Sequence, residues 1–155
     1  MKQLLKIKIQ IVYIAFVLLA MVTVFIGCSK EKQILTDSTW VVESMKINAD
    51  SFLENPPNGV NLTLSFLLVK SGYSFIFILE EGVMMGHITI RNNKIDFGDV
   101  LSLQEHELYK NSQFTKSCAQ LLGKVNRYET DGYDLILTGK KGEIINLTRK
   151  IEGVN

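Results

Sequence analysis

The first 28 residues constrain this chain more than any other stretch, because they limit what the remainder can use to build its fold. Three lysines among the first eight residues are followed by Ile9–Ile26, an 18-residue run interrupted only by one glutamine, one tyrosine and one threonine. Gly27 and Cys28 come directly afterwards. A basic start, an apolar core and a small residue before a cleavage point are the parts of a secretory signal. We therefore predict that the folded domain begins after this stretch.

The four residues Phe25–Cys28 resemble the bacterial lipobox, in which the cysteine becomes the first mature residue and carries acyl chains such as palmitate. Phe25 departs from the leucine usual at its position. The resemblance implies a signal peptide over 1–27, a lipidated cysteine with its tether over 28–34, and a single domain over 35–155. It also implies a membrane-anchored lipoprotein of the bacterial cell envelope, which we expect in the outer membrane. The alternatives are ordinary secretion and an uncleaved span, since about 18 apolar residues are the lower limit for crossing a bilayer.

Lipid attachment at Cys28 would leave Cys118 as the single cysteine of the domain. A disulfide within the chain is then impossible, so the domain must be held together by an apolar core. The chain has 17 basic and 16 acidic residues, which gives a formal net charge of +1. No basic cluster is interleaved with aromatic residues, so we expect no nucleic-acid partner.

Short segments of alternating polar and apolar residues, separated by turn residues, run through most of the domain. Asp131-Gly132 lies between two such segments and is typical of a tight hairpin. We predict that Trp40 buries its ring in the core at the start of the first strand. The predicted strands begin near Thr39 and continue over Asn61–Val69, Tyr73–Leu79, Val83–Ile90, Lys94–Phe97, Lys124–Glu129, Tyr133–Thr138 and Glu143–Lys150.

The region 100–120 fits neither the strand period nor the helix period well. Glu105–Lys110 and Cys118–Leu122 are each compatible with a helical turn, and the second would end at Gly123. We expect Gly98-Asp99 to end the strand that precedes this region. The whole pattern predicts an α+β fold that is predominantly β. It would be a small antiparallel curled sheet or a partly open barrel, with one or two short helices.

Three segments of the C-terminal half resemble the META domain, a family of bacterial envelope lipoproteins related to a heat-inducible protein: Thr115–Cys118, Leu122–Tyr128 and Asp131–Leu137. Nearer the N-terminus, Thr39–Ser44 resembles the opening strand of that family. The stretch Gly86–Phe97 resembles its middle hairpin. The resemblance implies a small β-rich α+β fold and an envelope location, and it implies no catalytic activity.

Two features depart from the META pattern. Met84 and Met85 stand near the place where the family usually has a Gly-Cys-Asn turn. The family's helix would here be shortened or displaced into Gln104–Lys116, because the Thr115–Cys118 and Leu122–Tyr128 motifs almost touch. A lipocalin-like lipoprotein domain, which also opens with a strand containing tryptophan, is the nearest rival.

Phe75, Phe77 and Met84 form the one candidate ligand pocket of the sequence. They could line a cavity for a hydrophobic molecule in the cup of a curled sheet. The simpler interpretation is that they fill the core, since methionine packs well into irregular gaps.

Candidate catalytic and metal-binding residues are sparse. Glu105-His106-Glu107 could contribute to a metal site, but a closed site needs about four ligands and the others are not evident. Glu80-Glu81 could form an acid–base pair, and Cys118 could act as a nucleophile beside His87 or His106. Hydrated acidic residues and a buried, inert thiol are the simpler interpretations. We therefore predict no catalytic residue, no metal and no cofactor.

Taken together, the sequence favours a non-enzymatic accessory or interaction module of the cell envelope. Its partners would be the membrane, through the lipid on Cys28, and an unknown protein or envelope component. The alternative is a carrier of a small hydrophobic ligand with a lipocalin-like cup. A hydrolase that uses Cys118 or the glutamate pair is the least favoured hypothesis.

Overall fold

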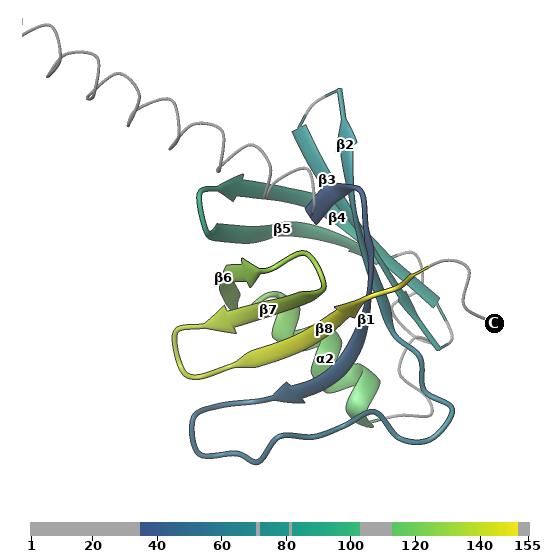
Figure 1. Ribbon diagram of the computed structural model, residues 1–155, viewed down its shortest axis with the longest axis vertical. Helices are drawn as coiled ribbons and strands as arrows, with labels where there is room; N and C mark the ends of the chain where they lie inside the picture. Colours follow the sequence, from purple (N-terminus) through teal and green to yellow (C-terminus); the bar gives the residue numbers. More distant parts are fainter. Residues whose placement is uncertain (1–34, 71, 81, 103–112, 152–155) are drawn as a thin grey trace, which may run out of the picture. The chain divides into compact units, whose positions relative to one another are not determined.

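The computed structural model describes residues 35–70, 72–80, 82–102 and 113–151. Their eight antiparallel strands close into a barrel in which each strand pairs with its neighbour in the sequence and β8 pairs with β1 (Figure 1). The elements are β1 (Thr39–Lys46), β2 (Thr63–Val69), β3 (Gly72–Leu79), β4 (Gly82–Arg91), β5 (Lys94–Ser102), α2 (Gln113–Leu122), β6 (Val125–Thr130), β7 (Asp134–Gly139) and β8 (Ile144–Arg149). The predicted antiparallel, predominantly β fold with a short helix is confirmed.

The interior of the barrel is filled by the apolar side chains of alternate strand residues. Phe75 and Phe77 of β3 point inward and are buried. The ring of Phe97 in β5 packs near two other rings. Its centroid is 6.2 Å from that of Phe66 in β2 and 5.1 Å, edge to face, from that of Phe75. Trp40 is wholly buried in the same cluster, as predicted. An eight-stranded barrel has an interior just wide enough for side chains to fill in this way.

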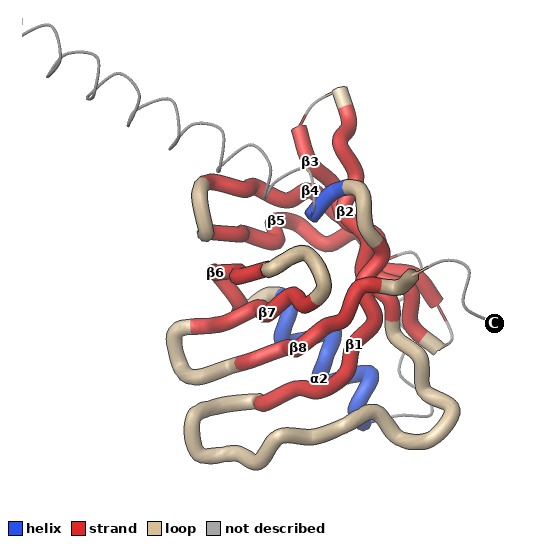
Figure 2. The backbone as a smooth tube through the Cα atoms, in the orientation of Figure 1, coloured by secondary structure: helices blue, strands red, loops and turns tan. Residues whose placement is uncertain are grey.

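One end of the barrel, which we call the helix end, is covered by α2. This helix buries its apolar side chains in the core and leads directly into β6. At the β3–β4 turn, Glu80 Oε2 accepts a hydrogen bond of 2.6 Å from Thr115 Oγ1 of α2. The long connection from β1 to β2 lies at the same end, where Figure 2 draws it as the tan loop at the foot of the view.

The opposite end, which we call the entry end, is where the chain enters the barrel. Leu35 is wholly buried there, and its carbonyl oxygen accepts a hydrogen bond of 3.3 Å from Trp40 Nε1. Leu35 belongs to the same core cluster as Trp40, so the first described residue is already part of the packed fold. The entry end consists of residues 35–38, the β2–β3 and β6–β7 turns, and residues 149–151.

Two predictions of element boundaries were wrong. The strand expected to end at Phe97 continues through Gly98-Asp99 to Ser102. Gly86 pairs with Val100 and Ile88 pairs with Phe97, so Gly98 and Asp99 together lie opposite the single residue His87, which is a bulge of one extra residue. A bulge of this kind accommodates an extra residue while the strand stays paired on both sides of it. The sequence pattern had predicted that the strand ends there.

The helix is also longer than expected, because α2 spans the whole Thr115–Cys118 motif and ends at Leu122. Of the predicted position Gln104–Lys116 for the displaced helix, the structure describes only Gln113–Lys116, which forms the start of α2; the rest lies outside the described residues. The helical turn expected at Glu105–Lys110 lies outside the described residues. Among those that are described, no helix is long and apolar enough to cross a membrane.

Candidate functional site

A groove of about 710 Å³ lies at the entry end, where the first turn of the domain, the start of β1 and the end of β8 meet. Hydroxyl groups, two basic side chains and apolar side chains contribute to its walls. It is lined by Thr36, Asp37, Ser38, Thr39, Ser65, Phe66, Leu67, Tyr133, Arg149, Lys150 and Ile151.

The wall next to β1 is held by short-range hydrogen bonds. Thr39 Oγ1 and Ser65 Oγ are 3.1 Å apart across the β1–β2 pair. On the other side, the backbone N–H of Lys150 donates to the carbonyl of Thr39 at 2.8 Å, which extends the β1–β8 pairing to the rim. The Ser38 hydroxyl is buried and has no hydrogen-bond partner among the residues that the structure describes. The groove therefore combines a fixed backbone with a free polar group.

The β6–β7 turn places Tyr133 on the groove. Asp131 Oδ1 accepts hydrogen bonds of 2.8 Å from the backbone N–H groups of both Asp134 and Tyr133, which is an Asx-type turn. These two bonds lower the pKa of Asp131 below its ordinary value. Gly132 supplies the positive φ of 99° that the turn needs. The result is a rigid turn that presents a tyrosine side chain 69% exposed to solvent.

The entry end exposes several large apolar side chains around this groove. Leu68 and Val69, at the tip of the β2–β3 hairpin, are 72% and 36% exposed. Ile151, directly after β8, is 64% exposed. Leu67, which is 41% exposed, lines the groove together with Tyr133 and Ile151. We call these exposed apolar side chains of the entry end, with Leu68 and Val69, the apolar rim.

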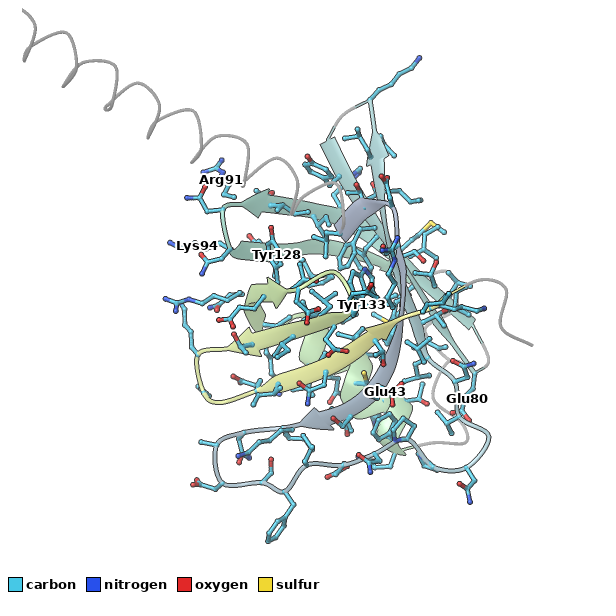
Figure 3. All side chains as sticks on the ribbon, in the orientation of Figure 1. Glu43, Glu80, Arg91, Lys94, Tyr128 and Tyr133 are labelled. Atoms are coloured by element: carbon cyan, nitrogen blue, oxygen red, sulfur yellow. The ribbon has the colours of Figure 1, made fainter. Side chains whose placement is uncertain are left out.

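Basic side chains occur at two hairpin tips and in the groove. Lys70 follows Val69 in the chain, and Arg91 pairs with Lys94 across the tip of the β4–β5 hairpin. Figure 3 shows Arg91 and Lys94 close together and directed away from the barrel. Arg149 and Lys150 line the groove itself.

A second apolar surface, which we call the outer patch, lies on the outside of β3 and β4. It consists of two cross-strand pairs, Ile76 with Met85 and Ile78 with Val83. Ile78 is exposed and the other three are half-buried. Outward-facing strand residues are ordinarily polar, so this surface is a candidate contact site.

The predicted pocket residues Phe75, Phe77 and Met84 come together inside the barrel, where Phe77 pairs with Met84 across β3 and β4. All three are buried in the core cluster. Four surface grooves in the described part of the chain are lined by other residues. The ligand pocket stays a prediction, and the packing favours a role in the core.

The other candidate residues do not converge in the described part of the chain. Cys118 is buried in α2, and this burial raises the pKa of its thiol to about 12. His87 lies on the outer face of β4, where its Nδ1 is 3.4 Å from Ser74 Oγ. Glu80 bonds α2 through Thr115. No group of three or more metal-ligating side chains is found among the described residues, and Cys28, Glu81 and His106 lie outside them.

The comparisons with known proteins bear on the fold. No protein-family model matches the chain, and no curated protein matches it either. A protein from Burkholderia xenovorans, known from an NMR structure, is similar with a TM-score of 0.61 and 18% identity, over 77% of this chain and 86% of that one. A DUF4847 family protein from Bacteroides vulgatus ATCC 8482 is similar with a TM-score of 0.57 and 13% identity, over 79% of this chain and 99% of that one. At these identities the likeness shows a shared fold.

The sequence-based predictions missed the groove and the rim at the entry end. Leu67-Leu68-Val69-Lys70 was assigned to a strand and a turn, so its exposed position at a hairpin tip was overlooked. One signal was present, since three apolar residues in a row directly before a turn break the inside–outside alternation. The convergence of Tyr133 and Arg149 with Ser38 had no such signal, because it depends on barrel closure.

Proposed function

We propose that this chain is a membrane-anchored lipoprotein of the bacterial cell envelope and that its barrel is a non-enzymatic accessory or interaction module. The observation that carries the proposal is the position of Leu35. This residue is wholly buried in the core and stands only seven positions after Cys28. A lipid on Cys28 would therefore hold the packed domain close to a bilayer.

Two further features support a role in binding. The outer patch offers apolar surface on an otherwise solvated sheet face, as contact sites of accessory proteins do. The buried, protonated thiol of Cys118 and the outward position of His87 give no support to nucleophilic catalysis. The partner would be a protein or another envelope component. The resemblance to the META family stays a prediction, and neither structural neighbour bears on it.

Metabolic labelling with palmitate tests the anchor. We expect label in the wild-type chain, none in Cys28→Ala, and undiminished label in Cys118→Ala, the matched control that removes the other cysteine. An unlabelled wild type would remove the proposed function.

The same cells test the interaction role. A photo-crosslinking residue at Ile78 in the outer patch should yield one reproducible adduct in intact membranes, and a second change, Val83→Lys, should abolish it. The same crosslinker at Phe52, which is 90% exposed at the helix end, is the control and should not give that adduct. Equal adducts from the two positions would count against a specific interaction surface.

A further inference from the structure

We propose that the entry end of the barrel docks on the membrane surface, with the apolar rim in the headgroup region and the neighbouring basic side chains against anionic lipid headgroups. The inference rests on the proposed lipid attachment at Cys28. It adds an orientation and a second membrane contact that the anchor alone does not provide. The observations that carry it are the reach of the tether, the chemistry of the rim and the charge of the entry end.

The tether sets which part of the domain can approach the bilayer. Seven residue steps separate Cys28 from Leu35, and a fully extended chain covers at most about 3.6 Å per residue, or about 25 Å in all. Leu35 lies at the entry end and is fixed in the core. Strands of about eight residues tilted by about 40° make the barrel roughly 20 Å tall, so the helix end can reach the bilayer only when the tether is almost fully extended. Every less extended tether favours the entry end.

The exposed side chains at the entry end match what a bilayer interface accommodates. Leu68 and Val69 form the tip of a hairpin, where they can enter the headgroup region without moving the rest of the fold. Tyrosine is enriched at membrane–water interfaces because its ring is apolar and its hydroxyl is polar, and Tyr133 stands on the same rim. Ile151 adds a fourth apolar contact.

The charges of the groove favour an anionic surface. Two basic side chains, Arg149 and Lys150, line it against one acidic side chain, Asp37. Lys70 follows the apolar tip of the β2–β3 hairpin. Lysine and arginine beside an inserted apolar segment can extend their aliphatic stems along it and keep the charge among the headgroups. Lys70, one residue from Val69, has the placement that this arrangement requires.

The groove at the entry end would then face the headgroups. Its hydroxyl-bearing wall and Arg149 and Lys150 offer donors to phosphate oxygens at the membrane surface. Docking would bury the apolar rim, which otherwise remains in contact with water.

The test uses the full, lipidated chain in phosphatidylcholine vesicles with and without phosphatidylglycerol. An environment-sensitive fluorophore is attached through Leu68→Cys or, as the matched control at the opposite end, through Phe52→Cys. The native Cys118 is buried and its thiol stays protonated, so the parent chain should remain unlabelled. We expect a lipid-borne quencher to reduce the signal at position 68 at least threefold more than at position 52, with the larger contrast in anionic vesicles.

A charge reversal sharpens the result. The double change Lys70→Glu and Lys150→Glu should reduce the contrast between the two positions by about half, whereas Lys46→Glu with Lys116→Glu, at the end of β1 and on α2 at the helix end, should leave it unchanged. Equal quenching at positions 68 and 52 in a chain whose lipid is verified by its mass would overturn the docking and leave the proposed function standing. A chain whose mass lacks the lipid would overturn the proposed function and the docking together.

Discussion

The two ends of the barrel are closed by different means. At the helix end, α2 buries six side chains against the core, namely Phe114, Thr115, Cys118, Ala119, Leu121 and Leu122. At the entry end, the side chains of Leu35 and Trp40 cover the core, and Trp40 Nε1 donates a hydrogen bond of 3.3 Å to the Leu35 carbonyl oxygen. The helix end is thus sealed by a dedicated helix, whereas the entry end is closed by two side chains, one in the first turn and one in β1. Both ends expose apolar side chains, Phe52 and Leu53 at the helix end and Leu68 and Val69 at the entry end, so the ends differ in how the core beneath them is sealed.

The turns at the two ends are nevertheless fixed in the same way. Asp131 accepts backbone hydrogen bonds in the β6–β7 turn at the entry end. At the helix end, Glu143 Oε2 accepts a 2.7 Å hydrogen bond from the backbone N–H of Lys141, and this bond lowers the pKa of Glu143. Local turn rigidity therefore does not distinguish the ends; the packing beneath them does.

The largest effect should follow from damage to the helix seal. Leu121→Ala removes a side chain that is almost wholly buried and leaves a cavity, so we expect the free energy of unfolding to fall by about 3 kcal/mol in urea denaturation. Leu68→Ala, a deletion of the same size at the exposed rim, should change it by less than about 0.5 kcal/mol. Similar losses from both changes would contradict the contrast between the ends.

A smaller loss is expected from the seal of the entry end. Trp40→Phe keeps an aromatic ring but removes the indole N–H, which leaves the Leu35 carbonyl without that donor. We expect a loss of about 2 kcal/mol in the free energy of unfolding, about half from the hydrogen bond and half from the smaller ring. A loss as large as that of Leu121→Ala would show that the two ends are sealed equally well.

The smallest effect concerns pH and the two turns. The folded-state pKa values of Asp131 and Glu143 are both lowered, so their contribution is complete above the unfolded-state values near pH 4 and is lost as the pH falls through the folded-state values. Asp131→Asn and Glu143→Gln should each make the fall of the urea midpoint below about pH 4 shallower. If both variants lose stability with acid as steeply as the wild type, these carboxylates do not hold the turns.

The strands were predictable because their signals are local. The Asp131-Gly132 turn and the alternating runs on either side give β6, β7 and β8 to within two residues of their observed ends. The β5 bulge was missed because glycine and aspartate are typical of a turn that ends a strand. Only the pairing with β4 shows that the strand continues beyond Gly98-Asp99.

The candidate site was less accessible to sequence patterns. The groove depends on the pairing of Trp40 with Arg149, which are more than a hundred residues apart. No local propensity encodes that contact. The pocket hypothesis for Phe75 and Phe77 instead followed from the apolar character of one strand, which a filled barrel explains equally well.

The single long-range pairing has a consequence for how the domain acquires its structure. Seven of the eight strand pairs join neighbours in the sequence, and only the β1–β8 pair joins the two extremes of the domain. Contacts between distant residues carry the greatest loop-closure cost, so we expect the hairpins to form early and the β1–β8 pairing to be the last and slowest event. Until Ile144–Arg149 has been synthesised, β1 has no closing partner and Trp40 lacks one side of its pocket. The fluorescence of this one tryptophan should therefore report the moment at which the barrel is completed.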